Sequence, residues 1–83
     1  MSTFVFKMKY PGKRWSDYLP EIFGNEIAEK LIIETNATAN TNTARIILCE
    51  FNNDKNIIEK ITSNENTLSA FLVKNNKVCK IFK

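Results

Sequence analysis

The side chains that could carry out chemistry in this 83-residue chain are few. The chain contains no histidine, so the commonest general acid–base and the commonest metal ligand are both missing. Its two cysteines, Cys49 and Cys79, stand far apart and have no partners at metal-ligand spacing. Neither Gly12 nor Gly24 belongs to a phosphate-binding loop. We therefore expect no enzymatic activity, no metal site and no cofactor.

Acidic side chains supply the remaining candidate groups for catalysis. Asp17 and Glu21 stand at i and i+4, and Glu26, Glu29 and Glu34 follow them. Paired carboxylates can bind Mg²⁺ or transfer protons. At this spacing, however, they are typical of the solvated face of a helix, which favours a surface role.

Both cysteines are predicted to be small buried residues. Cys49 alternates with Ile47 and Phe51 in an apolar segment, and Cys79 falls on the predicted apolar face of the last strand. We therefore expect reduced thiols that react slowly in the native protein. A disulfide between them is the alternative, and it requires adjoining strands and an oxidising compartment.

Basic side chains gather at the two ends of the sequence. Residues 1–19 hold four basic side chains and one acid, residues 20–65 hold four and eight, and residues 66–83 hold four and none. If the first and last strands adjoin, their lysines form one positive surface that attracts phosphates or an acidic protein patch. Lysines on edge strands also prevent aggregation, so charge alone does not decide between these roles.

Aromatic side chains interleave with the N-terminal cations between Tyr10 and Tyr18. Stacking residues beside cations suit single-stranded nucleic acid, but Tyr, Trp and Arg also dominate protein–protein hot spots. Trp15 and Tyr18 could equally cover the edge of a small core. The candidate binding residues are Lys7, Lys9, Tyr10, Lys13, Arg14, Trp15, Tyr18, Lys74, Lys77 and Lys80.

Hydrophobic periodicity predicts the elements that would position these groups. Residues 3–10 alternate as a half-buried strand does, with an apolar face of Phe4, Phe6, Met8 and Tyr10. A helix is expected to begin at Ser16 and to end at Gly24. Residues 25–36 fit either a helix or a strand, and we favour a helix through about Lys30 followed by a strand. Residues 36–43 are polar and of low complexity, which predicts a mobile loop.

The second half of the chain predicts a strand, a helix and a hairpin. Residues 44–51 are apolar on both faces, as in a central strand covered on two sides. Asn53 and Asp54 are expected to cap a short helix whose apolar stripe is Ile57, Ile58 and Ile61.

The hairpin consists of residues 68–74 and 77–82 around Asn75-Asn76, and asparagine tolerates the positive φ of a type I′ turn. In that register Leu72 faces Cys79, and Ala70 faces Ile81. These elements predict an α+β fold in a single domain over residues 1–83. Its antiparallel sheet would have about five strands, with about two helices packed on one face.

Three classes of function fit these observations. The first expectation is a non-enzymatic protein-binding module that inhibits or modulates a larger partner. The 10 Ile, 10 Lys and 11 Asn indicate an AT-rich gene, which suits an accessory protein of a phage or mobile element, such as an anti-defence inhibitor, an antitoxin-like protein or an immunity protein. The alternative is a small RNA- or single-stranded-DNA-binding module. A histidine-free ribonuclease, relying on Tyr10, Tyr18, Arg14 or Arg45, is the third.

The expected partner is therefore a protein, with nucleic acid as the alternative, and the oligomeric state stays open. Apolar runs such as Ile46–Cys49 and Ala70–Val73 extend over only four residues, far fewer than the roughly 20 that a membrane helix needs. Lys7 and Lys9 interrupt the early apolar stretch, as a signal-peptide core would not allow. We expect a cytoplasmic protein without membrane contact, in the host cell if it is phage-encoded.

Overall fold

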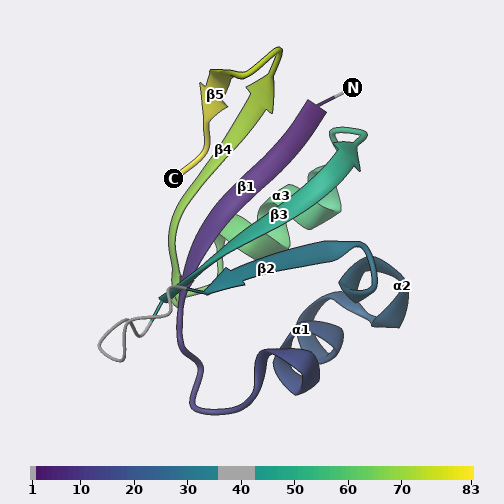
Figure 1. Ribbon diagram of the computed structural model, residues 1–83, viewed down its shortest axis with the longest axis vertical. Coiled ribbons are helices and arrows are strands. Elements are labelled where there is room, and N and C mark those ends of the chain that lie inside the picture. Colours follow the sequence, from purple (N-terminus) through teal and green to yellow (C-terminus); the bar gives the residue numbers. More distant parts are fainter. Residues whose placement is uncertain (1, 36–42) are drawn as a thin grey trace.

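The computed structural model describes residues 2–35 and 43–83 (Figure 1). Its elements are β1 (Ser2–Lys9), α1 (Trp15–Phe23), α2 (Asn25–Ala28), β2 (Leu31–Thr35), β3 (Thr43–Phe51), α3 (Lys55–Thr62), β4 (Thr67–Lys74) and β5 (Lys77–Ile81). The helix and strand favoured for residues 25–36 are therefore confirmed as α2 and β2. Of the loop expected at 36–43, residues 36–42 lie outside the described residues, and Thr43 begins β3.

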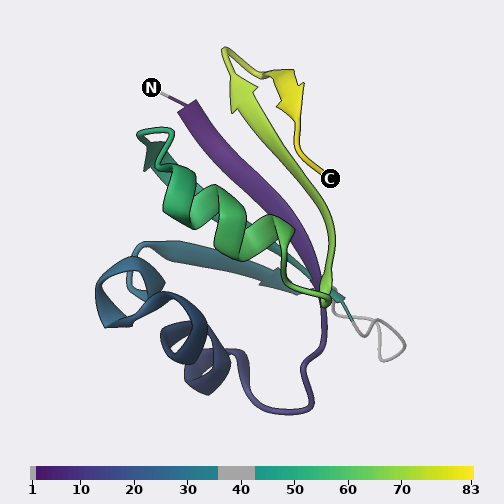
Figure 2. The same cartoon turned by 180° about the vertical axis from the view of Figure 1, so that it is seen from behind.

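The five strands form one antiparallel sheet in the order β2-β3-β1-β4-β5. The connection from β1 to β2 passes through α1 and α2, and the connection from β3 to β4 passes through α3, so each skips one strand. The first four strands with these two crossovers have the βαββαβ arrangement called ferredoxin-like, and β5 extends its edge. All three helices lie on one face of the sheet (Figure 2). The predicted α+β class is confirmed.

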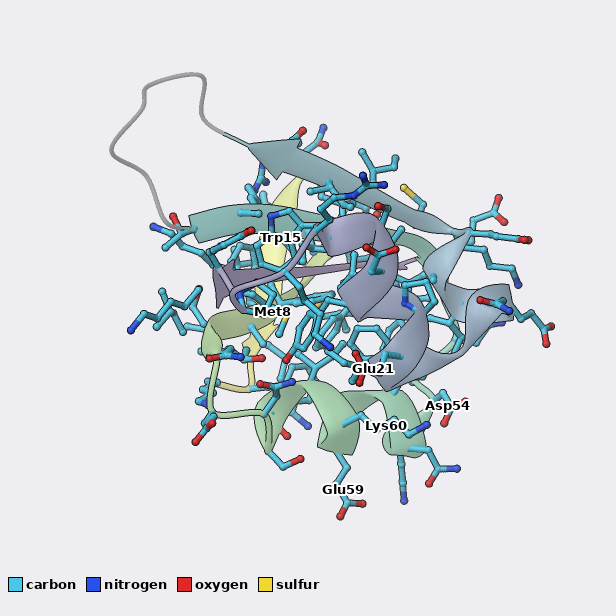
Figure 3. All side chains as sticks on the ribbon, turned by 90° about the horizontal axis from the view of Figure 1, so that it is seen from below. Met8, Trp15, Glu21, Asp54, Glu59 and Lys60 are labelled. Carbon is cyan, nitrogen blue, oxygen red and sulfur yellow. The ribbon has the colours of Figure 1, made fainter. Side chains whose placement is uncertain are left out.

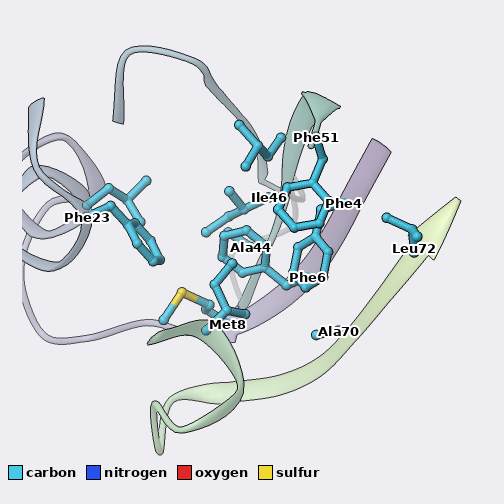
Figure 4. Packing of buried hydrophobic residues seen from close by; sticks show 12 residues of the cluster. Phe4, Phe6, Met8, Phe23, Ala44, Ile46, Phe51, Ala70 and Leu72 are labelled. Atoms are coloured by element: carbon cyan, nitrogen blue, oxygen red, sulfur yellow. The ribbon is translucent and has the colours of Figure 1, made fainter. Parts of the chain in front are cut away.

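The core fills the space between the sheet and the helices. Phe4, Phe6 and Met8 of β1 alternate toward the helices, and each is fully buried. Figure 4 shows the rings of β1 beside Phe51, with Phe23 of α1 approaching from the helical layer. In Figure 3 Met8 lies between the sheet and the helices, whereas Glu59 of α3 points into solvent. Tyr10, expected on this face, lies beyond the end of β1 and is 46% exposed, because the Pro11-Gly12 turn ends the ladder before it.

Local signals for the helices account for their ends. Gly24 terminates α1 with φ 83° and ψ 160°, a conformation that glycine adopts without strain. The Asp54 side chain accepts a hydrogen bond of 2.9 Å from the Asn56 backbone N–H and caps α3, as predicted. Ile61 then points into the core and is 1% exposed. Helix α1 begins at Trp15, one residue before the expected start at Ser16.

The C-terminal hairpin forms at the predicted turn but in a different register. Asn75 and Asn76 have φ of 54° and 61°, as a type I′ turn requires. Beyond the pair Val73–Val78 the register shifts, so that Leu72 pairs with Lys80 and Phe71 with Ile81. The predicted pairs Leu72–Cys79 and Ala70–Ile81 are therefore wrong, because a β-bulge inserts Cys79 as an extra residue.

The prediction that both cysteines are buried is also wrong. Cys79 occupies the bulge in edge strand β5, and Cys49 lies on the same face of β3 as Ile47. The expectation that β3 is covered on two sides fails, because the helices pack on one face only. Both cysteines are exposed free thiols.

Native protein should consequently react at both cysteines with a thiol reagent about as fast as unfolded protein does. An exposed thiol meets the reagent without any opening of the fold. Labelling rates of C49S and C79S, each with and without denaturant, assign the two sites. Native protection of more than about tenfold at either site would contradict the exposed placement.

Thr67 carries an unusual polar group for the core. The residue is 2% exposed, and its hydroxyl oxygen has no hydrogen-bond partner among the residues that the structure describes. Because an unpaired buried hydroxyl costs about 1–3 kcal/mol, Thr67→Val, which keeps the shape, should raise the free energy of unfolding by about 1 kcal/mol. Denaturant melts test this, with Thr67→Ser as the control that keeps the hydroxyl and loses the methyl group. A Val variant no more stable than the natural protein would show that the hydroxyl is satisfied.

Candidate protein-binding surface

The aromatic side chains of the N-terminal segment pack against one another and against the core. The rings of Tyr10 and Trp15 are 6.1 Å apart between centroids, and those of Trp15 and Tyr18 are 6.3 Å apart, both edge-on. The Tyr18 hydroxyl accepts hydrogen bonds from the side-chain amides of Asn64 (3.1 Å) and Asn66 (3.2 Å). The hydrogen bonds of Tyr18 join α1 to the segment between α3 and β4, and Trp15 packs against Tyr18. Both side chains therefore stabilise the fold.

The cations of the same segment, Lys13 and Arg14, form ion pairs with carboxylates of α1. Lys13 donates a hydrogen bond to Glu21, which raises the pKa of the Lys13 ammonium above its ordinary value. Arg14 lies 3.7 Å from Asp17 across one helical turn. Both pairs are exposed, so each adds little stability, but each places a carboxylate beside a cation expected to bind phosphate or protein. The carboxylates Asp17 and Glu21 thus lie at the surface, as expected.

The C-terminal lysines do not join the N-terminal ones in a single surface. β1 pairs with β4, and β5 lies one strand further out. Lys7 stands opposite Ser69, whereas Lys74 is five residues further along β4, about 16 Å away at strand spacing. Lys74 and Lys77 flank the hairpin turn, and Lys80 lies over the Phe82 ring at 5.1 Å. The merged positive surface expected from the sequence is therefore not formed.

The face of the sheet opposite the helices carries a continuous line of apolar side chains. Each strand contributes one residue at the same level, and these residues, here called the apolar row, are Ile32, Ile47, Val5, Phe71 and Ile81 in strand order. Val5 at the centre is only 3% exposed, because its neighbours in the row cover it. The ends of the row are open: Ile32 is 51% and Ile81 73% exposed. Val78, 55% exposed and paired with Val73, widens the apolar area at the β4–β5 end.

Two lysines border the apolar row on one side. Lys7 and Lys9 follow Val5 along the same face of β1, and both are exposed. Among the described residues neither makes an ion pair, whereas Arg45, opposite Lys7, donates to Glu34 at 3.0 Å. Of the candidate residues named from the sequence, Lys7 and Lys9 are the ones that lie on this face.

The apolar row was missed by sequence analysis. The predicted placement of Ile81 on the buried face is wrong, and Ile47 lies on the uncovered face of a strand predicted to be covered on both sides. The available signal was the apolar character of both faces of residues 44–51, together with Val5 and Phe71 at outward positions of their strands. Such residues indicate a second covering layer or an interface, and the structure supplies no helix for that layer within the described residues.

Grooves lie on the helical side of the described part of the chain. One, of about 700 Å³, runs between α3 and the β4–β5 hairpin, with Ile58, Leu72 and Phe82 in its lining. Another, of about 690 Å³, lies at the end of β3 and includes Glu26, Glu50 and Asp54. Across residues 2–35 and 43–83, no group of three or more Cys, Asp or Glu side chains is arranged to hold a metal ion.

None of the helices in the described ranges is long and apolar enough to cross a membrane. Comparison of the chain with protein-family models, with curated proteins and with solved structures found no match. The candidate binding surface is therefore the uncovered sheet face, where the apolar row and two exposed lysines lie together.

Proposed function

We propose that this protein is a non-enzymatic protein-binding module that docks a larger partner on the uncovered face of its sheet, and inhibits or modulates that partner by occupying its surface. The observation that carries the proposal is the apolar row, which crosses all five strands and ends in two strongly exposed isoleucines. Contiguous exposed apolar area bordered by charge is typical of protein interfaces. This function suits an accessory protein of a phage or mobile element.

The composition of the face favours protein over nucleic acid. Sheets of this arrangement that bind RNA stack bases on exposed aromatic rings of the central strands. Here the corresponding central positions are Val5 and Ile47, and the row's one aromatic, Phe71, is half-buried. Aliphatic side chains offer apolar area without stacking platforms, so they fit apolar side chains of a protein better than bases.

The uncovered face can be tested with two adjacent isoleucines of β2. Ile32 is 51% exposed in the row, and Ile33, 37% exposed, pairs with Ile46 of the core and so points to the opposite face. Ile32→Asp should weaken partner binding at least about 30-fold, because it places a charge among the exposed apolar side chains that would contact the partner, whereas Ile33→Asp should bind normally. Thermal melts of both variants verify that each is folded.

The measurement is retention of proteins on the immobilised module from a nuclease-treated lysate of the cells in which it acts. We expect a stoichiometric protein that the natural sequence and Ile33→Asp retain and Ile32→Asp loses. Retention that disappears with nuclease treatment would instead select the nucleic-acid alternative. A protein retained equally by Ile32→Asp would place the interface elsewhere.

A further inference from the structure

The chemistry of the partner can be specified further, on the condition that the proposed function holds. Lys7 and Lys9 lie on one side of the apolar row only, while the other side continues through Val73 and Val78. An apolar partner surface covering the row would also desolvate the nearer of these ammonium groups. Burying an unpaired ammonium is costly, so a partner that binds well must supply an opposite charge there.

We infer that the partner presents apolar side chains bordered on one side by carboxylates, which pair with Lys7 and Lys9 when the apolar side chains cover the row. Arg45 does not compete for these carboxylates, because Glu34 already engages it at 3.0 Å. The pairing fixes the direction in which the partner lies across the strands, since reversing it would place its carboxylates over Thr3 and Val73, where no cation of the described residues lies beside them on the same face. Charges at the border of an interface set orientation and association rate in this way.

A second copy of the chain does not meet this requirement. A two-fold axis parallel to the row would place Lys7 of one copy over the Val73 side of the other, without a carboxylate. A two-fold axis across the row would place Lys7 against Lys7, and like charges repel. The carboxylate of the uncovered face itself, Glu34, is already paired with Arg45 at 3.0 Å. The carboxylates Asp17, Glu21 and Glu26 lie on α1 and α2, behind the sheet, so contact with them would be head-to-tail and would not close into a dimer.

The test uses a displayed library of random linear peptides as the probe, selected in parallel on the natural protein and on three variants. The natural protein should enrich peptides that combine apolar with acidic residues. Lys7→Glu/Lys9→Glu should instead enrich apolar peptides with basic residues, and should bind a peptide selected on the natural protein at least tenfold more weakly at low salt. Lys74→Glu/Lys77→Glu makes the same charge change at the hairpin turn and should leave the selection unchanged. Ile32→Asp should lose the enrichment.

The outcomes separate the inference from the function on which it rests. Apolar peptides that depend on Ile32 but show no acidic preference, or keep it after Lys7→Glu/Lys9→Glu, would overturn the carboxylate pairing and leave the docking face in place. Enrichment unaffected by Ile32→Asp, or no enrichment at all, would overturn the docking face itself. Micromolar binding of a short labelled RNA at physiological salt, lost in Lys7→Glu/Lys9→Glu, would overturn both in favour of nucleic acid.

Discussion

Replacing Phe4 by alanine should remove between about a quarter and all of the free energy of unfolding. Phe4 is 0% exposed at the centre of β1, and its ring lies 4.9 Å from that of Phe51 and 5.4 Å from that of Phe82. It therefore joins the end of β3 and the C-terminal segment to the central strand. Truncating a buried phenylalanine costs about 3–5 kcal/mol, and a chain of this length has a total stability of about 4–12 kcal/mol.

The free energy of unfolding from denaturant melts measures this loss. Phe71→Ala is the matched control, because Phe71 is half-buried on the uncovered face of β4 and pairs with Val5. Its truncation should cost less than half as much, since part of that side chain is already in contact with water. Equal losses in the two variants would mean that both faces of the sheet are covered in solution, for example by self-association.

Leu72→Ala should lower the free energy of unfolding by about 2–4 kcal/mol, and we expect a value near the lower end of that range. Leu72 pairs with Phe4 and is 8% exposed, so its side chain belongs to the core. It also borders the groove between α3 and the β4–β5 hairpin, where water and neighbouring side chains can fill the space left by truncation. The cost of a cavity depends on how far the site can collapse, and this site can collapse further than that of Phe4.

Ile81→Ala provides the comparison for this hairpin. Ile81 is 73% exposed and sits on the opposite face of the sheet from Leu72, so its truncation should cost less than about 1 kcal/mol. The order of the two losses tests the register directly. If Ile81 were the more costly truncation, the bulge at Cys79 would be absent and the regular pairing of the hairpin would apply.

The approximate positions of most elements of this protein follow from the sequence by itself. The alternation of Phe4, Phe6 and Met8, the Asp54 cap and the Asn75-Asn76 turn are local signals, and each appears in the structure as expected. Local signals are reliable here because backbone preference and hydrophobic pattern agree at each of these positions. They were sufficient to predict an α+β fold with five strands.

The placement of the cysteines and of the candidate site was decided by tertiary structure. One bulge shifts the pairing of β5, and Glu50, at φ 56°, marks another irregularity, after which Phe51 turns into the core. A shift of one residue moves every later side chain of a strand to the other face, and nothing in a simple alternation signals where it occurs.

The candidate surface depends on strand order in the same way. Neighbouring residues of the row (Ile32, Ile47, Val5, Phe71 and Ile81) are 10 to 66 positions apart in the sequence and become one row only through the pairing of five strands. That order also keeps Lys74 and Lys77 away from Lys7, because β4 lies between β1 and β5. Sequence indicated which side chains could bind, and long-range pairing, which depends on the whole sheet, determined which of them share a face.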